Sequence, residues 1–274
     1  MNEKIIEFFE RENIEYYAAL DYKDVYEINP RLRERGGIEA RSVIVFLLPY
    51  YAGECENLSR YAASRDYHII IKEITSKLCA LIGEIYEGSL AIGFGDHSPI
   101  DERGAALRAG LGLLGENGLI LNEKYGSYVF IADVITDVPS ELIGASKPIP
   151  VLKCEGCGLC KKACPTGILR AESCDCLSAI TQKKGELTER EIEMMLKFNT
   201  VWGCDLCQSA CPHNKNPKTT PIEFFKQSRL PKLTLTAIES MSEESFKERA
   251  FAWRGRKTIV RNLEYYENKE KCKQ

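Results

Sequence analysis

The most constraining feature of this 274-residue chain is a run of four cysteines and a proline that begins at Cys154, with the spacing C-x2-C-x2-C-x3-C-P. Nine of the twelve cysteines fall within the 58 residues from Cys154 to Cys211. Three thiolates at this spacing hold corners of one [4Fe–4S] cluster, and the fourth, just before the proline, points at a neighbouring cluster. Zinc is the alternative metal, but it usually takes paired C-x2-C units. The run therefore predicts iron–sulfur clusters.

A second cysteine group, residues 204–212, repeats the end of the first group without its first cysteine. If the two groups exchange their fourth cysteines, the second cluster lacks one ligand, because two clusters need eight thiolates. Either Cys174 or Cys176 should fill that position, since no other cysteine of the window remains. The expected ligands are Cys154, Cys157, Cys160 and Cys211 for the first cluster, and Cys164, Cys204, Cys207 and one of those two for the second.

Composition indicates a globular chain of the cytosol. Hydrophobic residues make up 44% and charged residues 28%, a balance that suits a buried core and excludes disordered and fibrous classes. The first ten residues lack the basic and apolar regions of a secretory signal, and no apolar run approaches the ~20 residues of a membrane span. Because cytosolic thiols stay reduced, clustered cysteines there indicate metal sites more than disulfides. We therefore expect a cytoplasmic protein without a membrane segment.

Charge is distributed unevenly along the chain. Residues 222–274 carry 12 Lys and Arg against 8 Glu, or +4, which leaves −7 for the rest of a chain whose net charge is −3. A basic end can meet a polyanion even on an acidic protein. A solvated charged tail is the alternative interpretation.

Strand-like and helix-like segments alternate in the first half of the chain. The strand candidates are 42–50, 90–94 and 127–136, and the helix candidates are 67–82, 101–111 and, between the cysteine groups, 188–198. Thr188 and Glu191 have the spacing of a helix capping box. Three prolines in 139–150 indicate a linker. The pattern predicts an α/β or α+β domain over about residues 1–145.

Four further motifs occur in order along the chain. They are 59–68 (SRYAASRDYH), 96–103 (D-x-x-P-x-x-E-R), 109–117 (AGLGLLGEN) and 254–262 (RGRKTIVRN). With the two cysteine groups, they resemble the epoxyqueuosine reductase family from about Ser42 to Asn262. That family carries out the last step of queuosine synthesis in tRNA and depends on cobalamin and iron–sulfur clusters.

The resemblance implies an α+β fold with three parts. Residues 1–145 would form an α/β domain, related to the core of reductive dehalogenases, that binds base-off cobalamin and substrate. Residues 146–221 would form a ferredoxin-like domain with two [4Fe–4S] clusters, the nearer of which feeds electrons to the cobalamin. Residues 222–274 would form a basic helical segment.

The resemblance also implies roles for single residues. Asp96 is similar to the family's proton donor, whereas on its own it reads equally as a turn residue or a helix N-cap. Cys176 precedes the family's Ser-x-x-Thr pattern, which selects it as the eighth cluster ligand and leaves Cys174 spare. The residues expected to contact cobalamin or substrate are Ser59, Tyr61, His68, Arg103, Asn122, Gly126 and Ser127. On composition alone, His68 at a helix start reads as a capping or surface residue.

The implied reaction removes an epoxide oxygen with two electrons and two protons, giving an alkene and water. Cobalt in a low oxidation state can supply the electrons, while the protein binds and orients it. A carboxylic acid can protonate the leaving oxygen, which suits Asp96 if an apolar, partly buried site raises its pKa.

Some positions depart from the family pattern. Glu116 stands where the family usually has lysine, residues 182–185 are one residue short, and the chain stops soon after Asn262, where many members continue into a helical repeat that grips tRNA. The sequence thus resembles a short form. Residues 247–261, with Phe251 and Trp253, would then supply RNA contacts, or else pack their aromatic rings inward.

The expected partners are a tRNA anticodon carrying epoxyqueuosine and an external flavodoxin- or ferredoxin-like electron donor, with the protein itself a monomer. Two other functions compete with this one. The first is a corrinoid reductase that acts on a small molecule. The second is an iron–sulfur electron-transfer protein that never binds cobalamin.

Overall fold

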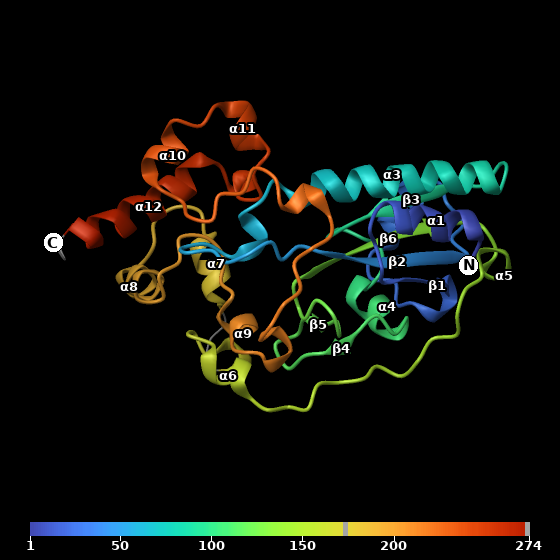
Figure 1. Ribbon diagram of the computed structural model, residues 1–274, viewed down its shortest axis with the longest axis horizontal. Coiled ribbons are helices and arrows are strands. Elements are labelled where there is room, and N and C mark those ends of the chain that lie inside the picture. The colour runs from blue at the N-terminus through green and yellow to red at the C-terminus, as the bar shows by residue number, and fades with distance from the viewer. Residues whose placement is uncertain (172–174, 272–274) are drawn as a thin grey trace. The chain divides into compact units, whose positions relative to one another are not determined.

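The computed structural model describes residues 1–171 and 175–271, which form two compact units (Figure 1). The first unit comprises Met1–Tyr50 and His68–Gly156, and the second comprises Tyr51–Tyr67 and Cys157–Gln274. No helix in the described part of the chain is long and apolar enough to cross a bilayer. The predicted domains end at residues 145 and 221 and were defined by the cofactors that they would bind. The division into compact units does not test cofactor binding, so these boundaries stay a prediction.

The first unit is built on an antiparallel four-stranded sheet of order β1-β2-β6-β3. Strand β2 pairs with β6 along its whole length, from Ser42 opposite Thr136 to Pro49 opposite Val129. The strands are β1 (Tyr17–Asp21), β2 (Ser42–Pro49), β3 (Ala91–Phe94) and β6 (Val129–Thr136), with a small second sheet of β4 (Leu113–Leu114) and β5 (Ile120–Leu121). Because every pairing is antiparallel, the unit belongs to the α+β class.

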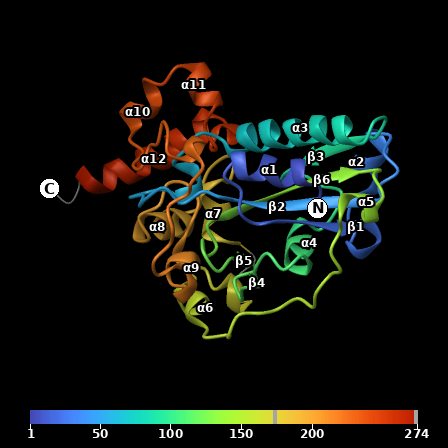
Figure 2. The same ribbon diagram turned by 45° about the vertical axis from the view of Figure 1, so that its right-hand side comes forward.

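Helices cover both faces of this sheet, which is why every residue of β2 is buried. Figures 1 and 2 show α1 and α3 on one face and α4 on the other. On the first face, the Phe9 and Phe46 rings lie 5.3 Å apart, and Gly93 leaves room for Thr75 of α3. The helices of this unit are α1 (Glu3–Arg11), α2 (Pro30–Arg35), α3 (Tyr67–Ile85), α4 (Glu102–Arg108), α5 (Ser140–Ile143) and the 3-10 turn η1 (Tyr22–Asp24).

The second unit consists of short helices joined by loops. They are η2 (Arg60–Ala62), α6 (Leu159–Ala163), η3 (Ile168–Arg170), α7 (Leu177–Thr181), α8 (Glu189–Lys197), α9 (Leu206–Ser209), η4 (Pro212–Asn214), η5 (Glu223–Phe225), α10 (Leu235–Glu239), α11 (Glu243–Lys247), η6 (Ala252–Arg254) and α12 (Arg256–Lys271). One core holds together its distant segments: Leu58, Trp202, Phe251 and Leu263 pack in it. The Asn57 amide, also buried, bonds both the N–H and the C=O of Leu233.

The predicted strands and helices are confirmed with end shifts of a few residues. The capping box of α8 is present, with the Thr188 hydroxyl accepting from the Glu191 N–H and the Glu191 carboxylate accepting from the Thr188 N–H. Strand β1 and the short helices of the cysteine region were not predicted, because elements of four or five residues carry too little periodicity to recognise.

Candidate functional site

Asp96 lies in the loop between β3 and α4 and faces a histidine. Its backbone is left-handed, with φ at +66°, and its Oδ2 is 3.5 Å from Nε2 of His68 in the first turn of α3. The two side chains are 48% and 49% exposed. The N-cap of α4 is Asp101, which accepts a hydrogen bond from Gly104, so the N-cap interpretation of Asp96 is wrong and the turn interpretation is confirmed. The side chain of Asp96 is thus only partly exposed, while the apolar surroundings that would raise its pKa stay a prediction.

A pair of carboxyl groups lies beside this loop, and the sequence interpretation missed it. Oε1 of Glu102 accepts a hydrogen bond from the Asp96 N–H at 3.2 Å. Asp133, in the middle of β6, is fully buried. Burial, followed by the charges of Asp133 and Asp96, raises the pKa of Glu102 to about 8, and burial raises the pKa of Asp133 to about 7. The missed signal is an aspartate inside the apolar run 129–136, since carboxylates are rarely buried without a function.

Arg103 follows Glu102 on α4, and its side chain is exposed. Its Nη1 donates a hydrogen bond to the carbonyl of Gly118 at 2.6 Å. This bond ties the first turn of α4 to the loop between β4 and β5.

Asn122, Gly126 and Ser127 are brought together in the tight loop that follows β5. Residues 122 and 126 exchange two backbone hydrogen bonds, and Gly126 has a left-handed φ of +60°. The Asn122 amide is buried, donates to the Leu111 carbonyl and accepts from the N–H groups of Lys124 and Tyr125. Asn122 therefore shapes this loop from inside.

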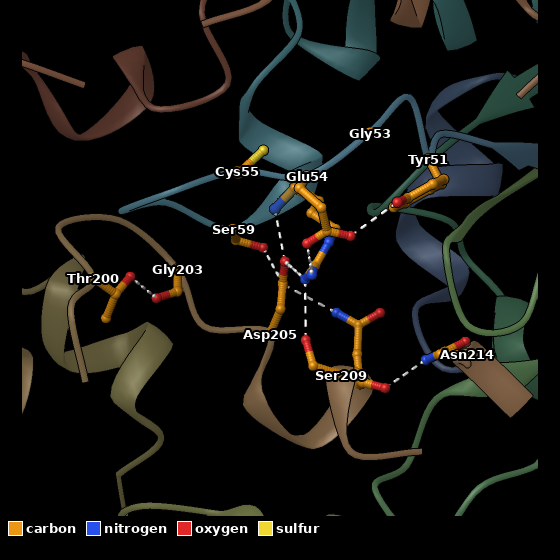
Figure 3. Close-up of polar contacts among 12 residues, drawn as sticks. Tyr51, Gly53, Glu54, Cys55, Ser59, Thr200, Gly203, Asp205, Ser209 and Asn214 are labelled. Carbon is orange, nitrogen blue, oxygen red and sulfur yellow. Dashed lines mark hydrogen bonds and ion pairs between the residues drawn. The ribbon is translucent and has the colours of Figure 1, made fainter. Parts of the chain in front are cut away.

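Ser59 and Tyr61 belong to the second unit, and Figure 3 shows Ser59 beside the loop of the second cysteine group. The Ser59 hydroxyl donates to the carboxylate of Asp205, a residue that stands between Cys204 and Cys207. Arg60 donates to the same carboxylate from its backbone N–H at 2.7 Å and from Nη1 at 3.1 Å. The indole N–H of Trp202 donates to the Tyr61 hydroxyl at 3.0 Å. The motif 59–68 is thus bonded directly to a cysteine loop.

The structure groups several of the expected cluster ligands. Helices α6 and α9, which carry Cys160 and Cys207, pack against each other. Burial raises the pKa of Cys204 to about 12, and the adjacent Cys176 and Cys207 add to that effect. The nearness of Cys176 to Cys204 supports its selection as the eighth ligand. Cys174 lies outside the described residues.

The environment of Cys164 favours the thiolate, whereas burial of Cys204 favours the neutral thiol. Burial favours the neutral thiol of Cys164, but hydrogen bonds from the Leu169 N–H and from Thr166 and Gly167 outweigh it and lower the pKa of Cys164. A lowered pKa favours the thiolate, which is the form that binds metal. Among the described residues, no three His, Cys, Asp or Glu side chains converge as one metal ion requires. A cubane needs no such convergence, because its four thiolates bind four different irons.

Cys154 belongs to the first unit, where its N–H donates to the Leu114 carbonyl at 3.0 Å. Its other expected partners, Cys157, Cys160 and Cys211, belong to the second unit. The membership of Cys154 in the first ligand set stays a prediction.

The two aromatic rings of residues 247–261 differ in burial, so inward packing is confirmed for one ring and RNA contact by the other stays a prediction. Phe251 is fully buried and packs against Trp202, with ring centroids 6.1 Å apart. Trp253 is 58% exposed, and the guanidinium of Arg254 lies 3.9 Å from its ring centroid. One ring therefore belongs to the core and the other to the surface.

Fold and thiols together define a class: iron–sulfur proteins that combine a two-cluster cysteine region with an α+β unit bearing an acid site. Two family models match the chain, one described as "4Fe-4S double cluster binding domain" over residues 153–214 and one as "Epoxyqueuosine reductase QueG, DUF1730" over residues 36–95. The cysteine region is therefore a double-cluster [4Fe–4S] domain.

Curated relatives identify the family. The epoxyqueuosine reductase of Cyclobacterium marinum is 32% identical and aligns over 93% of this chain and 86% of its own length. That of Bacillus cereus is 30% identical over 92% of this chain and 70% of its own length, and that of Staphylococcus aureus is 31% identical over 74% and 54%. The chain belongs to the epoxyqueuosine reductase family, whose members are oxidoreductases.

Solved structures agree with this assignment. A selenomethionine-labelled epoxyqueuosine reductase matches with a TM-score of 0.76 at 25% identity, over 96% of this chain and 80% of that one. The enzyme of Streptococcus thermophilus matches in fold with a TM-score of 0.77 at 22% identity, over 97% and 81%. The predicted α+β fold and the predicted family are confirmed.

Proposed function

We propose that this chain is a cobalamin-dependent reductase that converts epoxyqueuosine to queuosine in tRNA, with electrons delivered through two [4Fe–4S] clusters. The observation that carries the proposal is the half-exposed Asp96–His68 pair in a chain of this family. A protein of this fold has been solved with an epoxyqueuosine-modified tRNA-Tyr stem loop. The proposed nucleic-acid partner is accordingly a tRNA anticodon.

The clusters would be held by two sets of four cysteines. The first set is Cys154, Cys157, Cys160 and Cys211, and the second is Cys164, Cys176, Cys204 and Cys207. When bound, the clusters pass single electrons from an external flavodoxin- or ferredoxin-like donor. Such a donor, reduced thiols and an RNA substrate all suit a cytoplasmic location, and the protein is proposed to act as a monomer.

The residues present are compatible with base-off cobalamin. Its cobalt is bound by the nitrogens of the cofactor itself, so the protein does not have to supply a cluster of metal ligands. The residues proposed to contact the cobalamin or the substrate are Ser59, Tyr61, His68, Arg103, Gly126 and Ser127, with Asn122 acting through the shape of its loop. Cobalamin supplies low-valent cobalt for the two-electron reduction. The proposed domains are 1–145 for cobalamin and substrate, 146–221 for the clusters and 222–274 for the basic helical segment.

Asp96 would hold a proton on its carboxyl group and donate it to the oxygen that leaves the epoxide carbon. His68, 3.5 Å away, would orient that carboxyl. A related Bacillus subtilis enzyme, 25% identical with a TM-score of 0.76, has been solved with its aspartate-bearing catalytic loop swung out of the active site. Half-exposure of Asp96 therefore suits a loop that closes when substrate binds.

The test begins with anaerobic reconstitution, which should give about eight irons per chain. Cobalamin is then titrated and followed by its visible spectrum, and turnover of an epoxyqueuosine anticodon stem loop is measured. Asp96→Asn should keep the clusters and the bound cobalamin but lose turnover, on the order of a hundredfold or more. Asp137→Asn, which alters an aspartate that accepts a hydrogen bond from Leu90, is the matched control.

Each competing function has its own outcome in this experiment. A chain that carries both clusters and binds no cobalamin is an electron-transfer protein. A chain that binds cobalamin but leaves the RNA unchanged is a corrinoid reductase for a small molecule. Wild-type turnover in Asp96→Asn would remove Asp96 from the mechanism.

A further inference from the structure

Asp133 is an acid in the interior of the first unit. It lies in the middle of β6, opposite Phe94 of β3, and has no exposed surface. The Ser98 hydroxyl donates to its Oδ1 at 3.1 Å, while no donor in the described part of the chain bonds its Oδ2. A bare carboxylate in such surroundings is costly. We therefore expect a neighbouring group that can carry a proton to donate a hydrogen bond to Oδ2.

Glu102 is the group placed to do so. It is the first residue of α4, which packs against β6, and its carboxyl interacts with that of Asp133. Two carboxyl groups can form a hydrogen bond only when one of them carries a proton, because a carboxylate has no donor of its own. The pair therefore retains one proton under conditions in which isolated acids are ionised, in agreement with the raised pKa values of both groups.

The pair is connected to Asp96 through the backbone of the loop. The Asp96 N–H donates to Oε1 of Glu102, and the charge of Asp96 is one cause of the raised pKa of Glu102. The charged groups that act on Glu102 in the described part of the chain include Asp133 on β6 and Asp96 on the loop, and His68 on α3 faces Asp96. Arg103, the neighbouring cation, is bonded instead to the carbonyl of Gly118. Asp133, Glu102 and Asp96 thus form a series of neighbouring acids that extends from the core of the first unit to its surface.

We propose that Glu102 and Asp133 form a proton store that recharges Asp96 during turnover. The inference rests on the function proposed above. That reaction breaks two C–O bonds and forms a C=C bond, and it consumes two electrons from the cluster chain and two protons. Asp96 would give the first proton to the leaving oxygen. The store would then return one proton to Asp96, which protonates the resulting hydroxyl as it leaves as water. Solvent refills the store between turnovers.

The first test needs no cofactor. Infrared difference spectroscopy of the full chain during a pH titration should show a protonated carboxyl signal at neutral pH that is reduced and titrates differently in Glu102→Gln and in Asp133→Asn, and is unchanged in Asp137→Asn. Asp96→Asn should shift the midpoint of that signal to lower pH, because the charge that opposes ionisation of Glu102 is gone. The proposal of a proton store would be wrong if both carboxyl groups were ionised at neutral pH, or if Asp96→Asn did not change the midpoint of the signal.

The second test is turnover of the reconstituted enzyme on the anticodon stem loop. Glu102→Gln keeps an oxygen to accept the Asp96 N–H but cannot release a proton. We expect kcat to fall on the order of a hundredfold, with KM nearly unchanged and the alkaline limb of the pH–rate profile displaced. Asp137→Asn should behave like wild type. An unchanged kcat and pH profile in Glu102→Gln would overturn the proposal.

The two proposals fail in distinguishable ways. If the wild-type enzyme leaves the RNA unchanged, the proposed function fails, and the infrared titration then decides alone whether the pair holds a proton coupled to Asp96. If the wild type turns over and Glu102→Gln turns over equally well, the store fails and the function stands.

Discussion

The two units of this chain are stabilised in different ways. The first contains the eight-residue strands β2 and β6 and the 19-residue helix α3, and apart from Asp133 its sheet is packed mainly by apolar side chains. In the second, the helices that carry cluster ligands, α6 and α9, have five and four residues. Helices that short are not stable by themselves. We infer that burial of apolar side chains stabilises the first unit, whereas the fold of the cysteine region is stabilised by the clusters that its thiolates bind.

The largest expected effect is loss of the clusters. Chelation of iron from the anaerobically reconstituted protein should abolish amide hydrogen-exchange protection in α6, α7 and α9, because cluster ligation supplies folding free energy there. The amides of β2 and β6 should keep their protection. Equal loss in both units would contradict the comparison.

Next in size is a cavity in the first unit. Leu78 of α3 is fully buried, so Leu78→Ala should lower the free energy of unfolding of that unit by about 2–5 kcal/mol. Both tryptophans, Trp202 and Trp253, lie in the second unit. Tryptophan emission therefore reports the second unit, and exchange at β2 reports the first. Glu84→Ala, exposed on the same helix, is the control; an equal loss in both units would mean that they unfold together.

The third effect is a pH dependence confined to the first unit. The pKa values of Glu102 and Asp133, about 8 and about 7 when folded, exceed their ordinary values of 4.5 and 3.8, so folding takes up protons between about pH 4 and pH 8. Stability of the first unit should fall as pH rises through this window, by at most about 1.4 kcal/mol per pH unit for each proton. Asp133→Asn combined with Glu102→Gln should flatten the slope in denaturant unfolding followed by exchange at β2. A slope that persists in this double variant would mean that other groups cause the pH dependence.

The smallest effect concerns the surface of the second unit. Trp253→Phe should change the free energy of unfolding by less than about 0.5 kcal/mol, because the indole is 58% exposed. It should also remove most of the emission that acrylamide quenches, since Trp202 is fully buried. Strong quenching that persists in the variant would show that the core around Trp202 opens.

Sequence reasoning predicted the regular elements well, because β2 and α3 carry strong hydrophobic patterns. It proposed seven cluster cysteines from their spacing, and Cys176, Asp96 and His68 from family motifs, but it did not anticipate that Asp96 and His68 face each other. It missed Asp133, although a lone acid within 129–136 was visible. The bond between Ser59 and Asp205 could not be predicted, because those residues lie 146 positions apart and no periodicity links them.

The bond network of Asp205 also limits how related chains can differ. The Arg60 side chain is only 14% exposed, and its guanidinium donates to a carboxylate that is 8% exposed. Loss of Asp205 would leave the largely buried Arg60 guanidinium with Glu54 and Ser209 as its partners, and loss of the Arg60 side chain would leave the Asp205 carboxylate with fewer donors beside a cluster loop. A change at position 60 should therefore favour a compensating change at position 205, and the reverse.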